Sequence, residues 1–228
     1  MNVLILGSGG REHAFAHKIR QSSLCKNLYV APGNSGTGEI ASNLEINVNQ
    51  FEQIVEAIKN LNISLVVVGP EVPLVNGLTD FIKGFSDLKD IIVIGPNKHA
   101  AQLEGSKDFA KDFLNRHNIP TASHKTFTNE NIKDAFSYID EMKSPYVLKA
   151  DGLAAGKGVL IIKDPDEAKK ELEEMLINSK FGEASKSVVI EEFLDGIEVS
   201  CFVITDGKNY KLLPCLLYTS DAADDFDC

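Results

Sequence analysis

A lysine at the end of an apolar strand is followed at once by a glycine-rich turn. Lys149 ends the strand, and the turn contains Gly152, Gly156 and Gly158, with Lys157 between the last two. Glycine permits positive φ and lets backbone N–H groups approach an anion without a Cβ in the way. Because two lysines also flank the turn, the segment predicts a cradle for phosphate oxygens such as those of a nucleoside triphosphate.

The spacing of these glycines differs from that of a Walker A loop. The step from Gly152 to Gly156 is one residue short of that motif, and Gly158 stands where the motif needs a hydroxyl group for magnesium. A second apolar run, Val159 to Ile162, follows the turn, so the segment predicts a hairpin that closes over phosphates. Glycine-rich hairpins are also ordinary tight turns, and the segment by itself leaves both interpretations open.

A second glycine cluster, Gly7-Ser8-Gly9-Gly10, follows the first apolar strand. A dinucleotide fingerprint is disfavoured, because its third glycine falls at Glu12, whose carboxylate would oppose a pyrophosphate. What remains is a turn of free N–H groups beside Arg11, which suits a single phosphate ester. Alternatively, these glycines only let the first helix pack closely on the sheet.

Glu71 follows another buried strand at its carboxyl end, where open α/β sheets bind their ligands. It is a candidate contact for a ribose hydroxyl or an amine, and a helix N-cap is the alternative. The histidines lack metal-ligand spacing, and His13, in a first helical turn, is expected to be packed or solvated. We therefore assign no histidine to catalysis.

Six short motifs in order along the chain resemble the glycinamide ribonucleotide synthetases, or phosphoribosylamine-glycine ligases, a family of ATP-grasp enzymes of purine biosynthesis. They are GSGGREHA from Gly7, APGN from Ala31, VGPE from Val68, AQLEGSK from Ala101, KADGLAAGKGV from Lys149 and EEFLDG from Glu191. The resemblance extends from Met1 to about Pro214. Six linked motifs are far more specific than any one of them.

The resemblance implies which residues contact ATP. Lys107 and Lys149 match the family's two nucleotide lysines and would neutralise α- and β-phosphate oxygens, with the glycine turn as a flap and Lys157 reaching inward. Without the family context, an exposed helix lysine is the commoner interpretation of Lys107. The resemblance assigns the remaining nucleotide contacts to two groups. Glu191, Glu192 and Leu194 would form a hinge strand that contacts the edge of the adenine base, and the Glu198 carboxylate would accept hydrogen bonds from the ribose hydroxyls.

The resemblance also implies the substrates, glycine and 5-phosphoribosylamine. Glycine's carboxylate would attack the γ-phosphate of ATP, and the amine would capture the resulting acyl phosphate. Such steps need cations around the moving charge rather than a protein nucleophile, so we assign no catalytic residue. The family's amino-terminal domain faces phosphoribosylamine, which assigns its 5′-phosphate to Gly9, Gly10 and Arg11 and makes Glu71 a further substrate contact.

Short apolar strands alternate with amphipathic helices over the first hundred residues; the strands are expected at Val3 to Leu6, Leu28 to Val30, Leu65 to Val68 and Ile91 to Ile94. This order predicts an α/β domain at residues 1–97, built on a doubly wound parallel sheet. Helices at 98–118 form a bridge. Residues 119–214 predict an α+β unit, with strands around Tyr146 to Lys149, Val159 to Ile162, Val188 to Ile190 and Val199 to Ile204 and helices near Ile132 to Met142 and Pro165 to Ile177. The resemblance marks this unit as an incomplete ATP-grasp domain. Residues 215–228 resemble translated adapter sequence and are interpreted as a non-native tail, a native acidic tail being the alternative.

The resemblance places the ligands for Mg²⁺ or Mn²⁺, a glutamate and an asparagine, on strands beyond the end of this chain. We therefore expect the chain to have no ligase activity alone. Two other hypotheses remain, another ATP-grasp carboxylate ligase of purine metabolism and a non-catalytic nucleotide-binding fragment. The GGREH motif at Gly9 and the LEGSK motif at Leu103 favour the first assignment over the other ligases.

Composition limits the partners. A net charge of -10 argues against binding a nucleic-acid backbone, so individual lysines must contact phosphates. The 4 cysteines show neither C-x-x-C nor zinc-ligand spacing, which indicates a reduced, cytoplasmic protein. No signal peptide or membrane-spanning run is apparent, and oligomeric state cannot be predicted from these features.

Overall fold

The structure is a computed structural model and describes residues 1–154, 157–197, 199–213 and 216–217. The chain forms two compact units, Met1–Phe113 and Leu114–Cys228. Within the described residues, no helix combines the length and the apolar character needed to cross a membrane.

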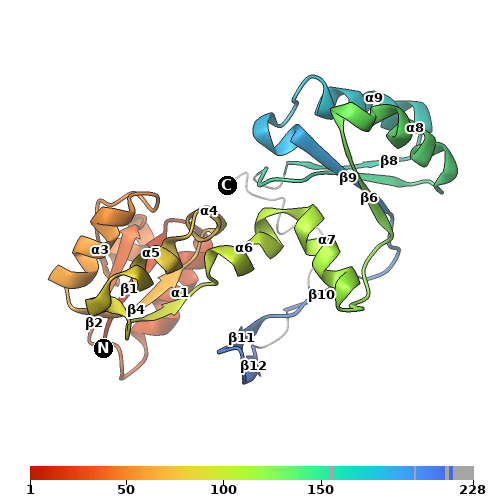
Figure 1. The fold of residues 1–228 in the computed structure, drawn as a ribbon. Helices are drawn as coiled ribbons and strands as arrows, with labels where there is room; N and C mark the ends of the chain where they lie inside the picture. The colour runs from red at the N-terminus through yellow and green to blue at the C-terminus, as the bar shows by residue number, and fades with distance from the viewer. Residues whose placement is uncertain (155–156, 198, 214–215, 218–228) are drawn as a thin grey trace. The chain divides into compact units, whose positions relative to one another are not determined.

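The first unit is a five-stranded parallel sheet with helices on both faces (Figure 1). Its strands, in the spatial order β3-β2-β1-β4-β5, are β1 (Asn2–Gly7), β2 (Asn27–Pro32), β3 (Ser42–Asn43), β4 (Ile63–Val68) and β5 (Ile92–Ile94). Its helices are α1 (Gly10–Arg20), α2 (Ser35–Gly38), α3 (Phe51–Asn60), α4 (Glu71–Val75), α5 (Leu78–Gly84), a 3₁₀ turn at Ser86–Leu88, α6 (Lys98–Gly105) and α7 (Lys107–Arg116), which continues into the second unit. The predicted doubly wound parallel sheet is confirmed.

The central strand β1 is apolar throughout because both of its faces are covered. Leu4 and Leu6 pack with α3 and α5 on one face, whereas Val3 and Ile5 pack with α1 on the other. All four side chains are almost fully buried. Burying a side chain of this kind contributes about 1.5–3 kcal/mol, so the continuous apolar run is a main source of stability for this sheet.

Between β1 and β4 the order of strands reverses. β2 and β3 lie on one side of β1, and β4 and β5 lie on the other. In an open parallel sheet such a reversal leaves a crevice at the carboxyl ends of the two strands, where ligands bind. Here those ends are the chain after Gly7 and the chain after Val68.

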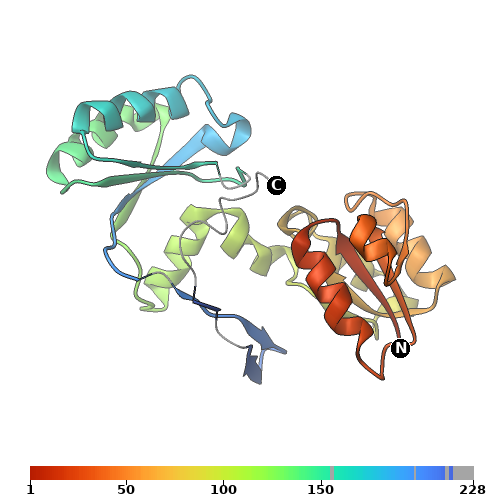
Figure 2. The same ribbon diagram turned by 180° about the vertical axis from the view of Figure 1, so that it is seen from behind.

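The second unit contains a four-stranded antiparallel sheet covered on one face by two helices (Figure 2). The strands, in the order β6-β9-β7-β8, are β6 (His124–Thr128), β7 (Tyr146–Ala150), β8 (Val159–Ile162) and β9 (Ser187–Glu192). The helices are α8 (Ile132–Glu141) and α9 (Pro165–Leu176), with 3₁₀ turns at Asn129–Asn131 and Gly182–Lys186. Strands β7 and β8 pair from Tyr146 with Ile162 to Lys149 with Val159, which confirms the predicted hairpin.

The two faces of this sheet differ in character. Leu148, Val188 and Ile190 belong to a core with α8 and α9. Side chains alternate along a strand, so Lys149 and Glu191 lie on the opposite face. The sheet therefore places an ion pair on the face that its helices leave uncovered.

Beyond β9 the described residues form two-stranded pairs. The predicted strand from Val199 to Ile204 is interrupted, giving β10 (Val199–Ser200) and β11 (Val203–Thr205). β11 pairs with β12 (Tyr210–Leu212), and β10 pairs with β13 (Leu216–Leu217). Asp206 closes the β11–β12 turn by accepting backbone hydrogen bonds from Asn209 and Lys208, which lower its pKa to about 2.

Three glycines enclose the side chain of Glu12 at the crevice between β1 and β4. A Cβ on Gly7 would lie 2.6 Å from Glu12 Cδ, and one on Gly9 would lie 3.1 Å from Glu12 Oε2. A Cβ on Gly69, in the chain after β4, would overlap Glu12 Oε1. The space that Glu12 occupies therefore favours glycine at Gly7 and Gly69 and leaves only a tight fit at Gly9, and a φ of 125° favours glycine at Gly7 as well.

We expect Gly69→Ala to destabilise the protein by about 1–3 kcal/mol, because the added methyl overpacks against a buried carboxylate. In a Glu12→Ala background the same change should cost much less. The four free energies of unfolding from urea titration form a double-mutant cycle that measures this coupling. Equal costs in the two backgrounds would contradict the packing argument.

Candidate functional site

Arg11 and Glu71 meet at the carboxyl ends of β1 and β4. Arg11 Nη1 donates to the carbonyl oxygen of Gly69 at 2.9 Å and to Glu71 Oε1 at 2.9 Å. The hydrogen bond to Glu71 raises the pKa of Arg11, and the charges of Glu71, Glu12 and Glu104 act in the same direction. The pair joins two residues that the sequence predicted to contact substrate.

The glycine turn after β1 differs from the predicted row of free N–H groups. Gly9 precedes the first residue of α1, and its N–H donates to Glu12 Oε2 at 2.7 Å. Gly10 begins the helix. One amide of the predicted phosphate cradle is therefore occupied by a carboxylate from the helix that it precedes.

A cleft of about 320 Å³ opens at this edge of the sheet. Its walls come from the segments after β1, β2 and β4 and from the segment before α3: Gly7, Ser8, Gly9, Glu12, Pro32, Asn47, Val48 and Pro70. Asn34, from the turn after β2, donates to the carbonyl oxygen of Ser8 at 2.8 Å and so ties that turn to the glycine loop.

Glu12 is a site residue that the sequence analysis did not select. It is only 6% exposed and yet lines the cleft. Its position three residues after Gly9 matches the spacing of a capping box, and that spacing was the available signal. This spacing predicts only the hydrogen bond at the start of the helix. It does not predict that Glu12 is buried beside a cleft, because that burial depends on the chain after β4, which is remote in sequence.

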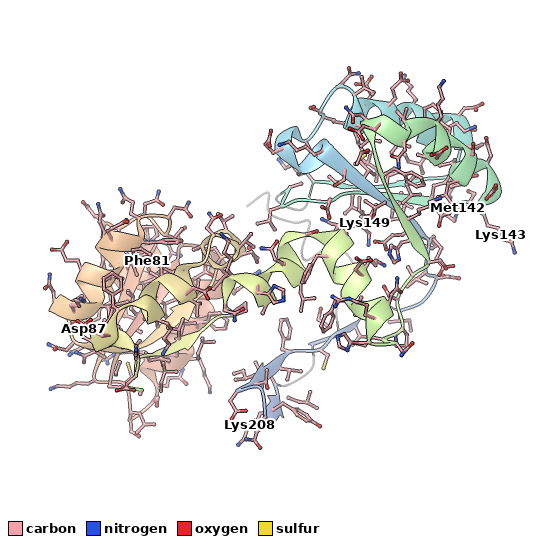
Figure 3. The ribbon with its side chains drawn as sticks, in the orientation of Figure 1. Phe81, Asp87, Met142, Lys143, Lys149 and Lys208 are labelled. Carbon is pink, nitrogen blue, oxygen red and sulfur yellow. The ribbon has the colours of Figure 1, made fainter. Side chains whose placement is uncertain are left out.

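In the second unit, Lys149 and Glu191 form an ion pair on the face away from α8 and α9. Figure 3 labels Lys149 on this sheet. Lys149 Nζ lies 3.0 Å from Glu191 Oε2, and the two side chains are 29% and 5% exposed. Val147 pairs with Glu191 and Lys149 pairs with Val189, so the two charged residues are diagonal neighbours across β7 and β9. The antiparallel register thus joins the predicted phosphate lysine to the predicted hinge strand.

The end of the hinge strand is anchored through Glu192. Its Oε1 accepts hydrogen bonds from the backbone N–H and the hydroxyl of Ser123, at 2.7 and 2.8 Å. The Glu192 side chain thus fixes the start of β6 to the end of β9. Leu194, two residues beyond the strand, is 66% exposed.

The glycines of the β7–β8 turn require a different explanation from the predicted one. Neither Gly152 nor Gly158 takes a positive φ. A Cβ on Gly152 would lie 3.0 Å from Ala184 Cα, and one on Gly158 would lie 2.8 Å from Ala154 Cβ. Close packing against the chain's own alanines, rather than a left-handed backbone, explains these two glycines.

Two more of the predicted nucleotide residues, Lys157 and Lys107, belong to separate segments of the described chain. Lys157 is exposed, and its N–H donates to the carbonyl oxygen of Ala154 at 3.0 Å. Lys107 begins α7 within the first unit. Gly156 and Glu198 lie outside the described residues.

Within the described ranges, no group of three or more histidine, cysteine, aspartate or glutamate side chains is arranged to hold a metal ion. The charged residues of the two sites instead form pairs, Arg11 with Glu71 and Lys149 with Glu191. These residues do not fit a metal centre, and we derive no step through one.

Two family descriptions match consecutive parts of the chain. Residues 1–104 match the phosphoribosylglycinamide synthetase N domain, and residues 105–220 match the ATP-grasp (A) domain of the same enzyme. The chain belongs to the phosphoribosylglycinamide synthetase family. The resemblance inferred from the six motifs is confirmed.

Curated relatives of this family are closely similar over most of the chain. The phosphoribosylamine–glycine ligase of Pasteurella multocida is 50% identical over 213 residues, which are 92% of this chain and 48% of the relative. The ligase of Pseudomonas syringae pv. tomato is 51% identical over 211 residues, 92% of this chain and 47% of the relative. The chain therefore spans about half the length of the curated relatives it matches.

Solved structures confirm the fold. The phosphoribosylamine–glycine ligase of Thermotoga maritima aligns with a TM-score of 0.76 and 32% identity over 94% of this chain and 49% of that chain. The N5-carboxyaminoimidazole ribonucleotide synthetase of the same organism aligns with a TM-score of 0.63 and 22% identity, over 94% of this chain and 52% of that chain. At that identity the second comparison supports the fold alone.

The Arg11–Glu71 pair should add little to stability, because both side chains are about half exposed, at 56% and 42%. Exposed pairs typically contribute about 0–1 kcal/mol and weaken in salt. A double-mutant cycle of Arg11→Ala and Glu71→Gln, followed by urea unfolding, should give a coupling below about 1 kcal/mol. A coupling several times larger would mean that the pair is structural and is not available to exchange partners with a ligand.

Proposed function

We propose that this chain forms the amino-terminal part of a phosphoribosylamine–glycine ligase. The enzyme would join glycine to 5-phosphoribosylamine and give glycinamide ribonucleotide, ADP and phosphate. The observation that carries the proposal is the match of both units to one family, with relatives at about 50% identity bearing that name.

In the proposed reaction, a carboxylate oxygen of glycine attacks the γ-phosphorus of ATP. The bond between the γ-phosphorus and the bridging oxygen breaks, and ADP leaves with that oxygen. The amine nitrogen of phosphoribosylamine then attacks the acyl carbon, inorganic phosphate leaves, and the nitrogen loses a proton. Charge moves between oxygens in both steps, so fixed cations and amides stabilise them.

Lys149 is the proposed phosphate contact of the second unit. It lies on the face of the sheet away from α8 and α9, 3.0 Å from the proposed hinge residue Glu191. A nucleotide that lies along this face would reach the lysine with its phosphates and the end of β9 with its base. The other proposed nucleotide contacts are Lys107, Gly152, Gly156, Lys157, Gly158, Glu192, Leu194 and Glu198.

The first unit is the proposed site for phosphoribosylamine. Gly9, Gly10, Arg11 and Glu71 lie at the crevice where the strand order reverses. An exposed arginine can exchange its protein partner for a phosphate ester, to which a guanidinium group donates two parallel hydrogen bonds. The metal ion that the reaction implies would be held by the part of the relatives that this chain does not span. We expect such an enzyme in the cytoplasm, with small-molecule substrates rather than nucleic acid.

Replacing Lys149 with alanine should weaken ATP binding by about tenfold to more than a hundredfold, because a charge-assisted hydrogen bond to phosphate is lost. Calorimetric titration of the two proteins with ATP measures the difference. Lys133→Ala is a matched control, because this exposed lysine lies on α8, on the other side of the sheet. NADH should bind neither protein well.

The control variant should bind ATP as tightly as the unaltered chain. If Lys149→Ala also binds ATP equally well, Lys149 is not in the nucleotide site. If both substitutions weaken binding alike, the effect is one of general positive charge. Either outcome leaves the family assignment unchanged but removes Lys149 from the proposed nucleotide site.

We expect no ligase turnover from the 228-residue chain with ATP, glycine and phosphoribosylamine, because it spans only about half of its relatives. A chimera in which residues 215–228 are replaced by the remaining half of a relative should be active. Phosphate release by the two proteins, with Lys149→Ala in the chimera as an inactive reference, makes the comparison. Equal turnover by the chain and the chimera would show that the unmatched half is dispensable.

A further inference from the structure

The cleft at the carboxyl ends of β1, β2 and β4 contains a carboxylate to which the proposed function gives no role. Glu12 lines this cleft of about 320 Å³ and is only 6% exposed. Its Oε2 accepts the N–H of Gly9 at 2.7 Å. Within the described chain, no protein group donates a hydrogen bond to its Oε1.

The glycines around Glu12 hold this carboxylate in place. Side chains at Gly7 or Gly69 would collide with it, and the hydrogen bond from Gly9 fixes one of its oxygens. The remaining oxygen can accept a hydrogen bond from a group that enters the cleft. An immobilised acceptor of this kind distinguishes ligands, because a ligand without a matching donor leaves a buried polar group unpaired.

The charge of Glu12 excludes one class of ligand group from the floor of the cleft. A phosphate placed there would meet a carboxylate of the same sign with little water to screen it. Arg11, which donates to Gly69 and Glu71 on either side of the lining residue Pro70, offers a cation for a phosphate. The Arg11 cation and the Glu12 carboxylate thus come from consecutive residues in the first turn of α1.

We propose that Glu12 is a substrate-binding residue that accepts a hydrogen bond from an O–H or N–H group on the sugar ring of a phosphorylated ribose, whose phosphate lies toward Arg11. The inference rests on the proposed function. It extends that function by assigning the phosphate of the substrate to Arg11 and the sugar ring to Glu12. A hydroxyl at C2 or C3 and the group at C1 present the same chemistry to a carboxylate.

The test uses the 228-residue chain and three stable probes: inorganic phosphate, ribose 5-phosphate, and the 1,4-anhydro analogue that lacks the C1 hydroxyl. Glu12→Gln keeps the shape of the side chain but removes its charge. We expect the affinity for ribose 5-phosphate to fall by about tenfold or more, whereas inorganic phosphate should bind as well as before or better. Arg11→Ala should weaken both ligands alike.

The anhydro analogue identifies the donor. If Glu12→Gln no longer affects binding of the analogue, Glu12 contacts the C1 group; if the loss persists, it contacts a C2 or C3 hydroxyl. Either result supports the proposal. An unchanged affinity of Glu12→Gln for ribose 5-phosphate, an equal loss for inorganic phosphate, or no binding of ribose 5-phosphate by the unaltered chain would overturn it.

Thermal unfolding without ligand shows whether Glu12→Gln still folds. If it does not, a second variant, at Ser8, tests the proposal. Ser8 is exposed, lines the cleft, and uses only its carbonyl oxygen in the described hydrogen bonds. Ser8→Leu should narrow the cleft, keep the unfolding temperature and abolish binding of ribose 5-phosphate; intact binding would overturn the proposal. Because the Lys149 test concerns the other unit, a failure of ATP binding and a failure at Glu12 are distinguishable.

Discussion

The enclosure of the Glu12 carboxylate is the constraint on which the first candidate site depends. A buried carboxylate is unfavourable unless hydrogen bonds compensate for its lost hydration, and the N–H of Gly9 supplies one of them. The side chain also fills the space between the chain after β1 and the chain after β4, where only glycine leaves room for it. The two loops that form the crevice are therefore positioned against one side chain, and Arg11 reaches Gly69 and Glu71 from the same helix start.

This constraint changes the interpretation of the glycine-rich motifs. Such motifs are usually explained by anion binding, in which the missing Cβ admits a phosphate. In this chain Gly7, Gly9 and Gly69 admit a protein side chain, and Gly152 and Gly158 admit the alanines of neighbouring segments. A glycine that is required for packing can still lie beside a ligand. The presence of such a glycine, however, does not by itself show that a phosphate group of the ligand occupies the space left by the missing Cβ.

The second candidate site depends on the two-faced character of an antiparallel sheet. Strands β7 and β9 pack the apolar side chains of one face against α8 and α9, and the alternation of side chains then places Lys149 and Glu191 on the other face. The register of β7 against β9 then makes Lys149 and Glu191 diagonal neighbours, although they are far apart in the chain. One face of the sheet thus presents Lys149 and the end of β9 together, which is the arrangement that the proposed nucleotide site needs.

Much of the fold followed from sequence pattern. Continuous apolar runs predicted β1, β2, β4 and β5, because strands buried on both faces tolerate few polar residues. The β7–β8 hairpin and helices α8 and α9 were also predicted within a residue or so of their observed ends. Strand β6 was missed, since His124–Thr128 is mostly polar and becomes a strand by pairing with β9. The same applies to the two residues of β3, which form a strand only beside β2.

The sequence by itself determined the family, because six motifs in a fixed order are a property of the chain that needs no coordinates. It also determined that Arg11, Glu71, Lys149 and Glu191 are site candidates. Tertiary structure alone decided how they are paired, which amide of the glycine turn is already occupied, and that Glu12 faces a cleft. The physical reason is that each of these properties depends on the distance between segments remote in sequence, which strand order and register fix and local composition does not.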